Sequence, residues 1–132
     1  MKYLVLLLSL LSPLVGAEKD VIYPTYPVTA WRVIDGDTIE TTLNLGFRLT
    51  KVVYARPQGI DTPELSGDSA EAGRAVSMVV GNWLADNKPV SLKYIKQGKF
   101  GGRVICDIQG SSGETLSHFL LRHSLAKPYD GG

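Results

Sequence analysis

The sequence predicts a mainly β domain with two helices, folded as a small barrel. Three observations support this prediction. The chain has 132 residues, which is enough for one hydrophobic core. Runs rich in β-branched and aromatic residues are separated by turn-forming residues. Apolar residues at helical spacing occur in two further segments.

The first three predicted strands form an antiparallel meander. Residues 28–34 and 38–43 are β-prone and flank Asp35-Gly36, a dipeptide typical of hairpin turns. A second turn is expected at residues 44–46, and a third β-prone run extends from residue 47 to residue 60. Consecutive strands joined by short turns usually pair with each other, so these three should form one sheet.

Helical and β-type patterns alternate in the second half of the chain. Apolar residues recur at helical spacing over residues 68–86, which predicts an amphipathic helix. Strands are expected at residues 90–95 and 103–108, and a short second helix at residues 116–123. The resulting order, βββ-α-ββ-α, is typical of a five-stranded Greek-key barrel of the OB type.

The N-terminus has the pattern of a secretory signal peptide. Lys2 precedes an apolar run over residues 3–15, and small residues then predict cleavage after Ala17. A retained membrane anchor is the alternative, but the run is shorter than the roughly 20 residues that span a bilayer. Residues 18–27 are polar and contain prolines, so we expect a tether there and a single domain over residues 28–132. The mature chain should be secreted or periplasmic, with no membrane contact.

Charge and cysteine content limit the functions that are open to this chain. Without Lys2, the mature chain loses one of its 14 basic residues and balances its 13 acidic ones. A nucleic-acid binder with no basic excess must depend on a few local cations. Cys106 is the lone cysteine, so no disulfide can form within the chain, and its apolar neighbours indicate a small buried side chain rather than a catalytic thiol.

Acidic residues gather at two predicted strand ends. Asp35 and Asp37 lie in the first hairpin, where acids often serve only as turn formers. Asp61 follows an apolar pair at the end of the third run, so its carboxylate needs water or a cation. The Asp37 and Asp61 carboxylates and the Thr62 carbonyl are hard oxygen ligands of the kind that Ca²⁺ prefers. Glu64 could then accept a proton from a bound water or orient that water.

Two arginines could neutralise a phosphate beside such a cation. Arg56 precedes Asp61 by five residues, and this odd separation would place them on opposite faces of a regular strand. A bulge at Gly59 would bring them to the same face. Arg103 follows Gly101-Gly102, whose backbone freedom allows it to turn inward.

Three segments resemble the signature stretches of the staphylococcal nuclease (thermonuclease) family, and they occur in the family's order. They are VIDGDT at residues 33–38, GIDTPE at 59–64 and KFGGR at 99–103. The ending at residues 120–127 is also similar to the family's last conserved helix, and the likeness extends over about residues 28–129. The resemblance implies an OB-type barrel and a monomeric, calcium-dependent nuclease that acts on DNA or RNA without a stable protein partner.

The resemblance also implies a role for individual residues. Asp37, Asp61 and the Thr62 carbonyl would bind calcium, and Glu64 would be the general base or position the water. Arg56 and Arg103 would hold the phosphate. Weaker roles at the substrate fall to three further residues: Asp35, Lys99 and Tyr129.

Some positions depart from the family pattern. Arg48 lies too far before Asp61 to be the first catalytic arginine, so Arg56 is preferred. Two glycines precede Arg103 where one is expected, and Tyr129 is one residue out of register. The family's final helix has no counterpart before Gly132.

Two other functions remain open at this point. Related domains that have lost their catalytic residues serve as binding modules for nucleic acid or protein. An unrelated OB-type domain could instead bind saccharide or protein, with the acids as turn residues. The first is disfavoured because all six expected chemical positions are filled, and the second leaves the combination of acids with Arg56 and Arg103 unexplained.

Overall fold

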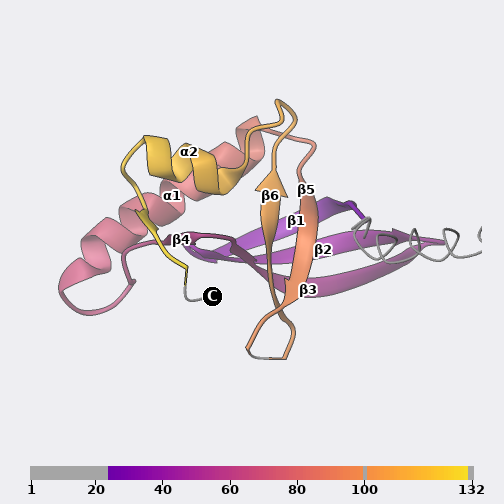
Figure 1. Ribbon diagram of the computed structural model, residues 1–132, viewed down its shortest axis with the longest axis horizontal. Helices are drawn as coiled ribbons and strands as arrows, with labels where there is room; N and C mark the ends of the chain where they lie inside the picture. Colours follow the sequence, from indigo (N-terminus) through magenta and orange to yellow (C-terminus); the bar gives the residue numbers. More distant parts are fainter. Residues whose placement is uncertain (1–23, 100, 131–132) are drawn as a thin grey trace, which may run out of the picture.

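Five strands close into a barrel in the computed structural model, which describes residues 24–99 and 101–130 (Figure 1). Neighbouring strands follow the order β1-β2-β3-β6-β5. These strands are β1 (Tyr26–Asp35), β2 (Thr38–Gly46), β3 (Leu49–Pro57), β5 (Ser91–Gln97) and β6 (Arg103–Gln109). The barrel and its two α-helices confirm the mainly β fold. The expected signal peptide lies outside the described residues.

The barrel begins earlier than the sequence indicates. Tyr26 pairs with Leu92 and Pro27 pairs with Ser91, which joins β1 to β5 and closes the barrel. The assignment of residues 18–27 to a tether is therefore wrong for its last two residues. The Tyr26 ring packs against the core, and its burial outweighs the polar, proline-bearing composition around it.

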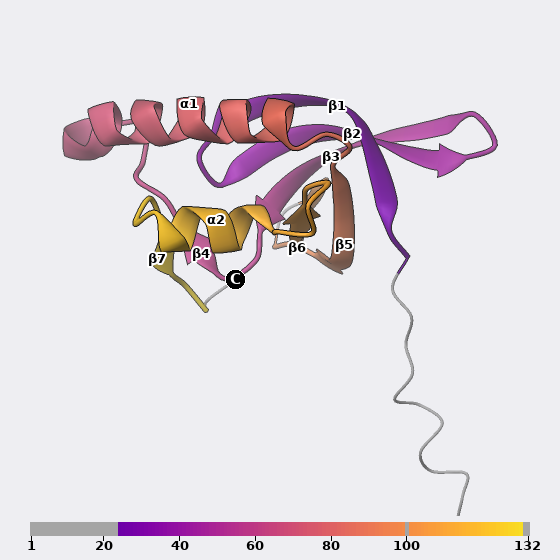
Figure 2. The same cartoon turned by 90° about the horizontal axis from the view of Figure 1, so that it is seen from above.

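The turn between β2 and β3 lies further along the chain than expected. β2 continues through residues 44–46, where a turn was predicted, and the chain reverses at Phe47-Arg48. Asn44 pairs with Thr50 across the two strands, and its Oδ1 accepts from the Gly46 N–H at 2.9 Å. The β2–β3 hairpin projects well beyond the barrel (Figure 2).

Helix α1 (Ala70–Asp86) follows a 3₁₀ turn, η2 (Gly67–Ser69), and packs against β1. This confirms the predicted amphipathic helix, with a buried face at three- and four-residue spacing: Gly73, Val76, Val80, Trp83 and Leu84. The helix ends where the Asn87 side chain donates to the Trp83 carbonyl at 2.8 Å. Among the described residues, no helix is both long enough and apolar enough to cross a membrane.

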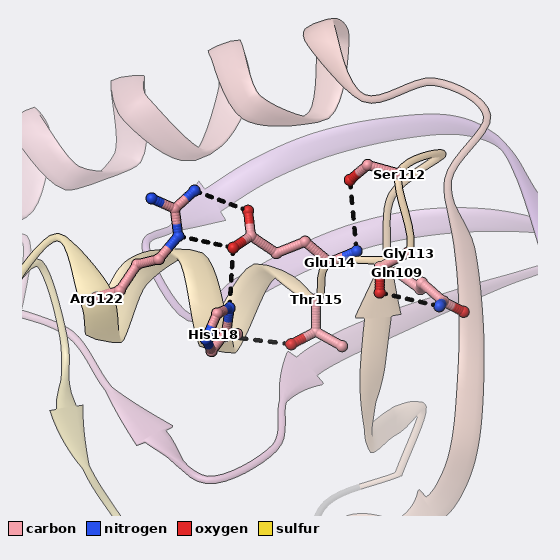
Figure 3. A network of polar contacts seen from close by, with 7 residues as sticks. All are labelled: Gln109, Ser112, Gly113, Glu114, Thr115, His118 and Arg122. Atoms are coloured by element: carbon pink, nitrogen blue, oxygen red, sulfur yellow. Dashed lines mark hydrogen bonds and ion pairs between the residues drawn. The ribbon is translucent and has the colours of Figure 1, made fainter.

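Helix α2 (Leu116–Arg122) is held by polar contacts at its start (Figure 3). Thr115 caps it by accepting from the His118 N–H at 3.2 Å. The Glu114 carboxylate accepts from Arg122 Nε at 2.7 Å and Nη2 at 3.1 Å, and it also contacts His118 Nδ1 at 2.9 Å. These contacts stabilise the helix that leads into the C-terminal strand.

Two short strands form a separate pair beside the barrel. β4 (Ile60–Asp61) pairs antiparallel with β7 (Lys127–Pro128), which places Asp61 opposite Lys127. The predicted third strand thus ends at Pro57, and the chain turns at Gln58-Gly59, where Gly59 has φ +82°. The C-terminal segment therefore holds the segment that carries Asp61.

Cys106 lies in the barrel interior, as the sequence predicted. Its side chain is fully buried among apolar residues. Burial, aided by the nearby negative charge of Asp107, raises the pKa of the thiol to about 12. A thiol that stays protonated is a poor nucleophile, which agrees with a packing role.

Candidate functional site

The β1–β2 turn packs directly against the segment that follows β4. The Asp37 N–H donates to Asp35 Oδ1 at 3.1 Å, and the Thr62 N–H donates to Asp37 Oδ2 at 3.2 Å. A Cβ at Gly36 would lie 2.7 Å from Thr62 Oγ1 and 2.8 Å from Val76 Cγ1. Glycine is therefore required at position 36 because the turn approaches Thr62 and Val76 too closely to leave room for a side chain. The sequence analysis had identified Gly36 only as a turn-forming residue.

Arg56 connects the two acidic segments. Its Nη1 lies 3.2 Å from Asp37 Oδ2, and its Nη2 lies 3.6 Å from Asp61 Oδ1. Nη2 also donates to the Ile60 carbonyl at 3.3 Å. The expected bulge at Gly59 is a turn instead, and this turn interrupts the strand so that Arg56 and Asp61 meet despite their odd separation.

These contacts are largely withdrawn from solvent. The Asp37 side chain is 9% exposed and that of Arg56 is 16% exposed, whereas Asp61 is 50% exposed. Charge interactions strengthen as water is excluded, so the contact between Arg56 and Asp37 is the stronger of the two. Asp61 remains open to a ligand from solution.

Arg103 approaches the same corner of the barrel from β6. β6 runs parallel to β3, and Arg103 pairs with Tyr54. Its Nη2 donates to Thr38 Oγ1 at 3.0 Å, which places the guanidinium beside the residue after Asp37. The buried Nε of Arg103 has no hydrogen-bond partner in the described part of the chain. The sequence analysis did not identify Thr38 as a site residue. The one feature that could have indicated it is its position directly after Asp37.

Glu64 lies in a different part of the site from Arg56. Glu64 is exposed and lines a cavity of about 410 Å³ together with Asp61, Ser69 and Lys127. Arg56 lines a separate cavity of about 260 Å³ with Tyr129. Asp61 contacts Arg56 and also borders the Glu64 cavity, so it links the two halves of the site.

The three residues with weaker expected roles fall in different places. Asp35 is the last residue of β1, directly before the turn that carries Asp37. The Tyr129 ring faces Arg56, with the guanidinium carbon 5.5 Å from the ring centre. The Tyr129 N–H donates to the Gly59 carbonyl at 2.9 Å, which fixes this segment. Lys99 is exposed in the β5–β6 connection, and no contact among the described residues joins it to Arg56 or Asp37.

The two carboxylates of the β1–β2 turn differ in acidity. Burial, together with the hydrogen bond and charge of Asp37, raises the pKa of Asp35 to about 6. Burial also acts to raise the pKa of Asp37, but hydrogen bonds from Asp35 and the Thr62 amide and the charge of Arg56 outweigh it. The pKa of Asp37 is lowered as a result. Asp37 is therefore the more acidic member of the pair and loses its proton at a lower pH than Asp35.

Oxygen atoms of the kind that a hard cation prefers lie at this corner, where both carboxylates also contact Arg56. The Asp37 and Asp61 carboxylates and the Thr62 carbonyl would offer oxygen ligands, and the buried Thr62 Oγ1 has no hydrogen-bond partner among residues 24–99 and 101–130. Within those same residues, no group of three or more His, Cys, Asp or Glu side chains is arranged to hold a metal ion. A cation here would thus depend on two carboxylates, a carbonyl and water.

Comparison with known proteins adds no family to this description. No protein-family model matches the chain, and no curated protein matches it at a significant level.

Proposed function

We propose that this protein is a calcium-dependent phosphodiesterase that hydrolyses DNA or RNA, on an OB-type Greek-key barrel of the staphylococcal nuclease kind. The observation that carries the proposal is the meeting of Arg56 with Asp37 and Asp61, with Arg103 bound next to Asp37 at Thr38. Arg56, Asp61 and Arg103 come from three different strands, and Asp37 comes from the β1–β2 turn. Two arginines beside two carboxylates suit a phosphodiester and a cation.

The arginines would stabilise charge on the phosphate. Negative charge develops on the phosphoryl oxygens during hydrolysis, and fixed donors aimed at them lower the barrier. The Nε of Arg103 supports this role: it has no hydrogen-bond partner among the described residues, a buried donor without an acceptor is costly, and a phosphate oxygen would supply one. Arg56 would offer its two terminal nitrogens, and Tyr129 would support its guanidinium from the side.

The carboxylates and Glu64 would serve the attacking water. Asp37, Asp61 and the Thr62 carbonyl would hold Ca²⁺, which when bound polarises a phosphoryl oxygen and a water. Glu64 lies exposed beside Asp61 in the 410 Å³ cavity, where it would accept the proton of that water or orient it. Asp35 and Lys99 would act on the substrate from the edge of the site. The N-terminal apolar run supports action outside the cytoplasm. We expect the enzyme to act as a monomer, as the family resemblance implies.

Cleavage of single-stranded DNA by the full chain, with Ca²⁺ and with a chelator, tests this proposal. Arg56→Ala and Arg103→Ala should each lower the rate by about 10²–10³. Arg32→Ala is the matched control, since Arg32 is an exposed arginine of β1 paired with Glu40. Cooperative thermal unfolding of each variant shows that it is folded. Near-normal rates in both site variants would disprove the phosphate contacts.

Glu64 requires a separate measurement. Glu64→Gln should lower the rate but leave calcium binding, measured by calorimetry, largely intact. Loss of calcium binding would instead identify Glu64 as a metal ligand.

A non-catalytic binding module is the second candidate. The observation that favours it is that Arg56 already has three partners, in Asp37, Asp61 and the Ile60 carbonyl. A purely structural ion pair would look the same. A folded protein that binds labelled single-stranded DNA but does not cleave it with Ca²⁺ would establish this alternative.

A further inference from the structure

The tip of the β2–β3 hairpin exposes a group of apolar side chains far from the candidate site. Phe47 is 98% exposed, and its neighbours Leu45, Leu49 and Val52 are also exposed. Asp37 and Phe47 lie ten residues apart along β2, which rises about 3.3 Å per residue, a separation on the order of 30 Å. Figure 2 shows the tip reaching away from the barrel, on the side opposite β4 and β7.

The backbone of the tip presents these side chains in an unusual way. Phe47 has φ 54° and Arg48 has φ 61°, so both turn residues adopt the left-handed conformation. Two-residue hairpin turns of this kind usually contain Asn-Gly, since bulky residues are strained there. The turn is held by the Gly46–Leu49 pair and the Asn44 side chain. Strained exposed residues of this kind often mark a functional surface.

The charges around the tip have one sign. Residues 41–60 contain no aspartate or glutamate, whereas Arg48 and Lys51 lie within the hairpin. Apolar side chains with flanking cations and no acids complement a surface that is apolar inside and anionic outside.

We propose that the hairpin tip, residues 44–52, docks on an anionic phospholipid bilayer. Phe47 and Leu49 would enter the boundary of the acyl chains, while Arg48 and Lys51 would remain at the headgroup phosphates. This goes beyond the proposed nuclease function, and it revises the expectation that the mature chain has no membrane partner.

Other occupants fit the tip less well. Phe47 is the one aromatic residue of the tip, and the other exposed apolar side chains there, Leu45, Leu49 and Val52, are aliphatic, so successive bases of a single strand would find no row of rings on which to stack. Two copies of the chain joined tip to tip would bring Arg48 and Lys51 against their own counterparts, which like-charge repulsion opposes.

A fluorophore at the tip tests the proposal in the full chain. Phe47→Cys can be labelled selectively with an environment-sensitive dye, because Cys106 is fully buried. The matched control is Met78→Cys, on an exposed position of α1. Vesicles of phosphatidylglycerol and phosphatidylcholine should blue-shift and brighten the tip label several-fold but leave the α1 label unchanged. Arg48→Ser and Lys51→Ser should each weaken this response about fivefold.

Each contrary outcome overturns the proposal. An unchanged tip label with vesicles would show that the tip stays in water. An equal response to phosphatidylcholine alone would remove the role of anionic lipid. A response to single-stranded DNA without vesicles would assign the tip to nucleic acid, and a response that grows with protein concentration alone would assign it to self-association.

Discussion

At the residue scale, two glycines determine how closely the parts of the candidate site approach one another. Gly36 lets the β1–β2 turn contact Thr62, as described above. Gly73 lets α1 contact the chain at Glu64, because a Cβ at this position would overlap the Glu64 carbonyl oxygen. In the sequence, Gly73 looks like a weak point in a helix; in the structure it is the place where the helix meets the segment of Glu64.

Substitution of Gly73 should therefore have an effect opposite to that of the other glycine of α1. Gly73→Ala should destabilise the protein by about 1–3 kcal/mol, because the methyl group meets backbone that cannot move aside easily. Gly81→Ala should stabilise it by about 0.5–1 kcal/mol, because its nearest neighbour would be 3.9 Å away and alanine favours helix. Urea unfolding of both variants measures the difference. Equal effects would show that the contact with Glu64 is loose.

At the element scale, α2 depends on a residue outside the helix. The apolar positions Leu116, Phe119 and Leu120 predicted the helix itself. The sequence did not show that Glu114 reaches both His118 and Arg122 (Figure 3). The hydrogen bond from Arg122, with that of His118 and the charges of both, lowers the pKa of Glu114 to about 2.

This lowered pKa predicts a specific loss of stability in acid. An acid whose pKa is lower in the folded state contributes stability above its unfolded pKa of about 4.5, and the contribution is lost as pH falls toward 2. The stability advantage of the parent over Glu114→Gln should shrink across this range in urea unfolding. When Arg122 is replaced by Gln in both proteins, the difference in unfolding free energy between the forms with Glu and with Gln at position 114 should depend much less on pH, because Arg122 makes the largest contribution to the lowered pKa of Glu114. An advantage that does not change with pH would contradict an ionic role for Glu114.

At the scale of the whole molecule, the closed barrel shields Cys106 from water. β6, which carries this residue, lies between β3 and β5. Exposure of the thiol therefore requires the barrel to open. Thiol reactivity should report on global unfolding.

The raised pKa of Cys106 also predicts a loss of stability in alkali. The thiol ionises near pH 9 in the unfolded chain but at about 12 in the folded protein. The unfolded state thus binds fewer protons between these values, and stability falls as pH rises through this window. At a pH of about 10 the loss from this group should be on the order of 1 kcal/mol. The free energy of unfolding of Cys106→Ala, measured at neutral and alkaline pH, should fall less with rising pH than that of the parent protein. An identical pH dependence in the two proteins would disprove the contribution of the Cys106 thiol.

The sequence by itself determined the type and order of the five barrel strands and the two α-helices, and the burial of Cys106, but not the short strands β4 and β7. These follow from local patterns, because side-chain alternation in strands and three- to four-residue spacing in helices depend on near neighbours. The sequence also identified Arg56 and Asp61 as site residues, but it could place them on the same face only by assuming a bulge at Gly59.

Only the tertiary structure decided where strands begin, end and pair. Tyr26 joins β1 because Leu92 lies opposite it, and the hairpin turns at Phe47-Arg48 because Gly46 pairs with Leu49. β7 holds Asp61 through hydrogen bonds to residues more than sixty positions away. Such pairings depend on hydrogen bonds and packing between distant segments, and no local pattern in the sequence encodes them.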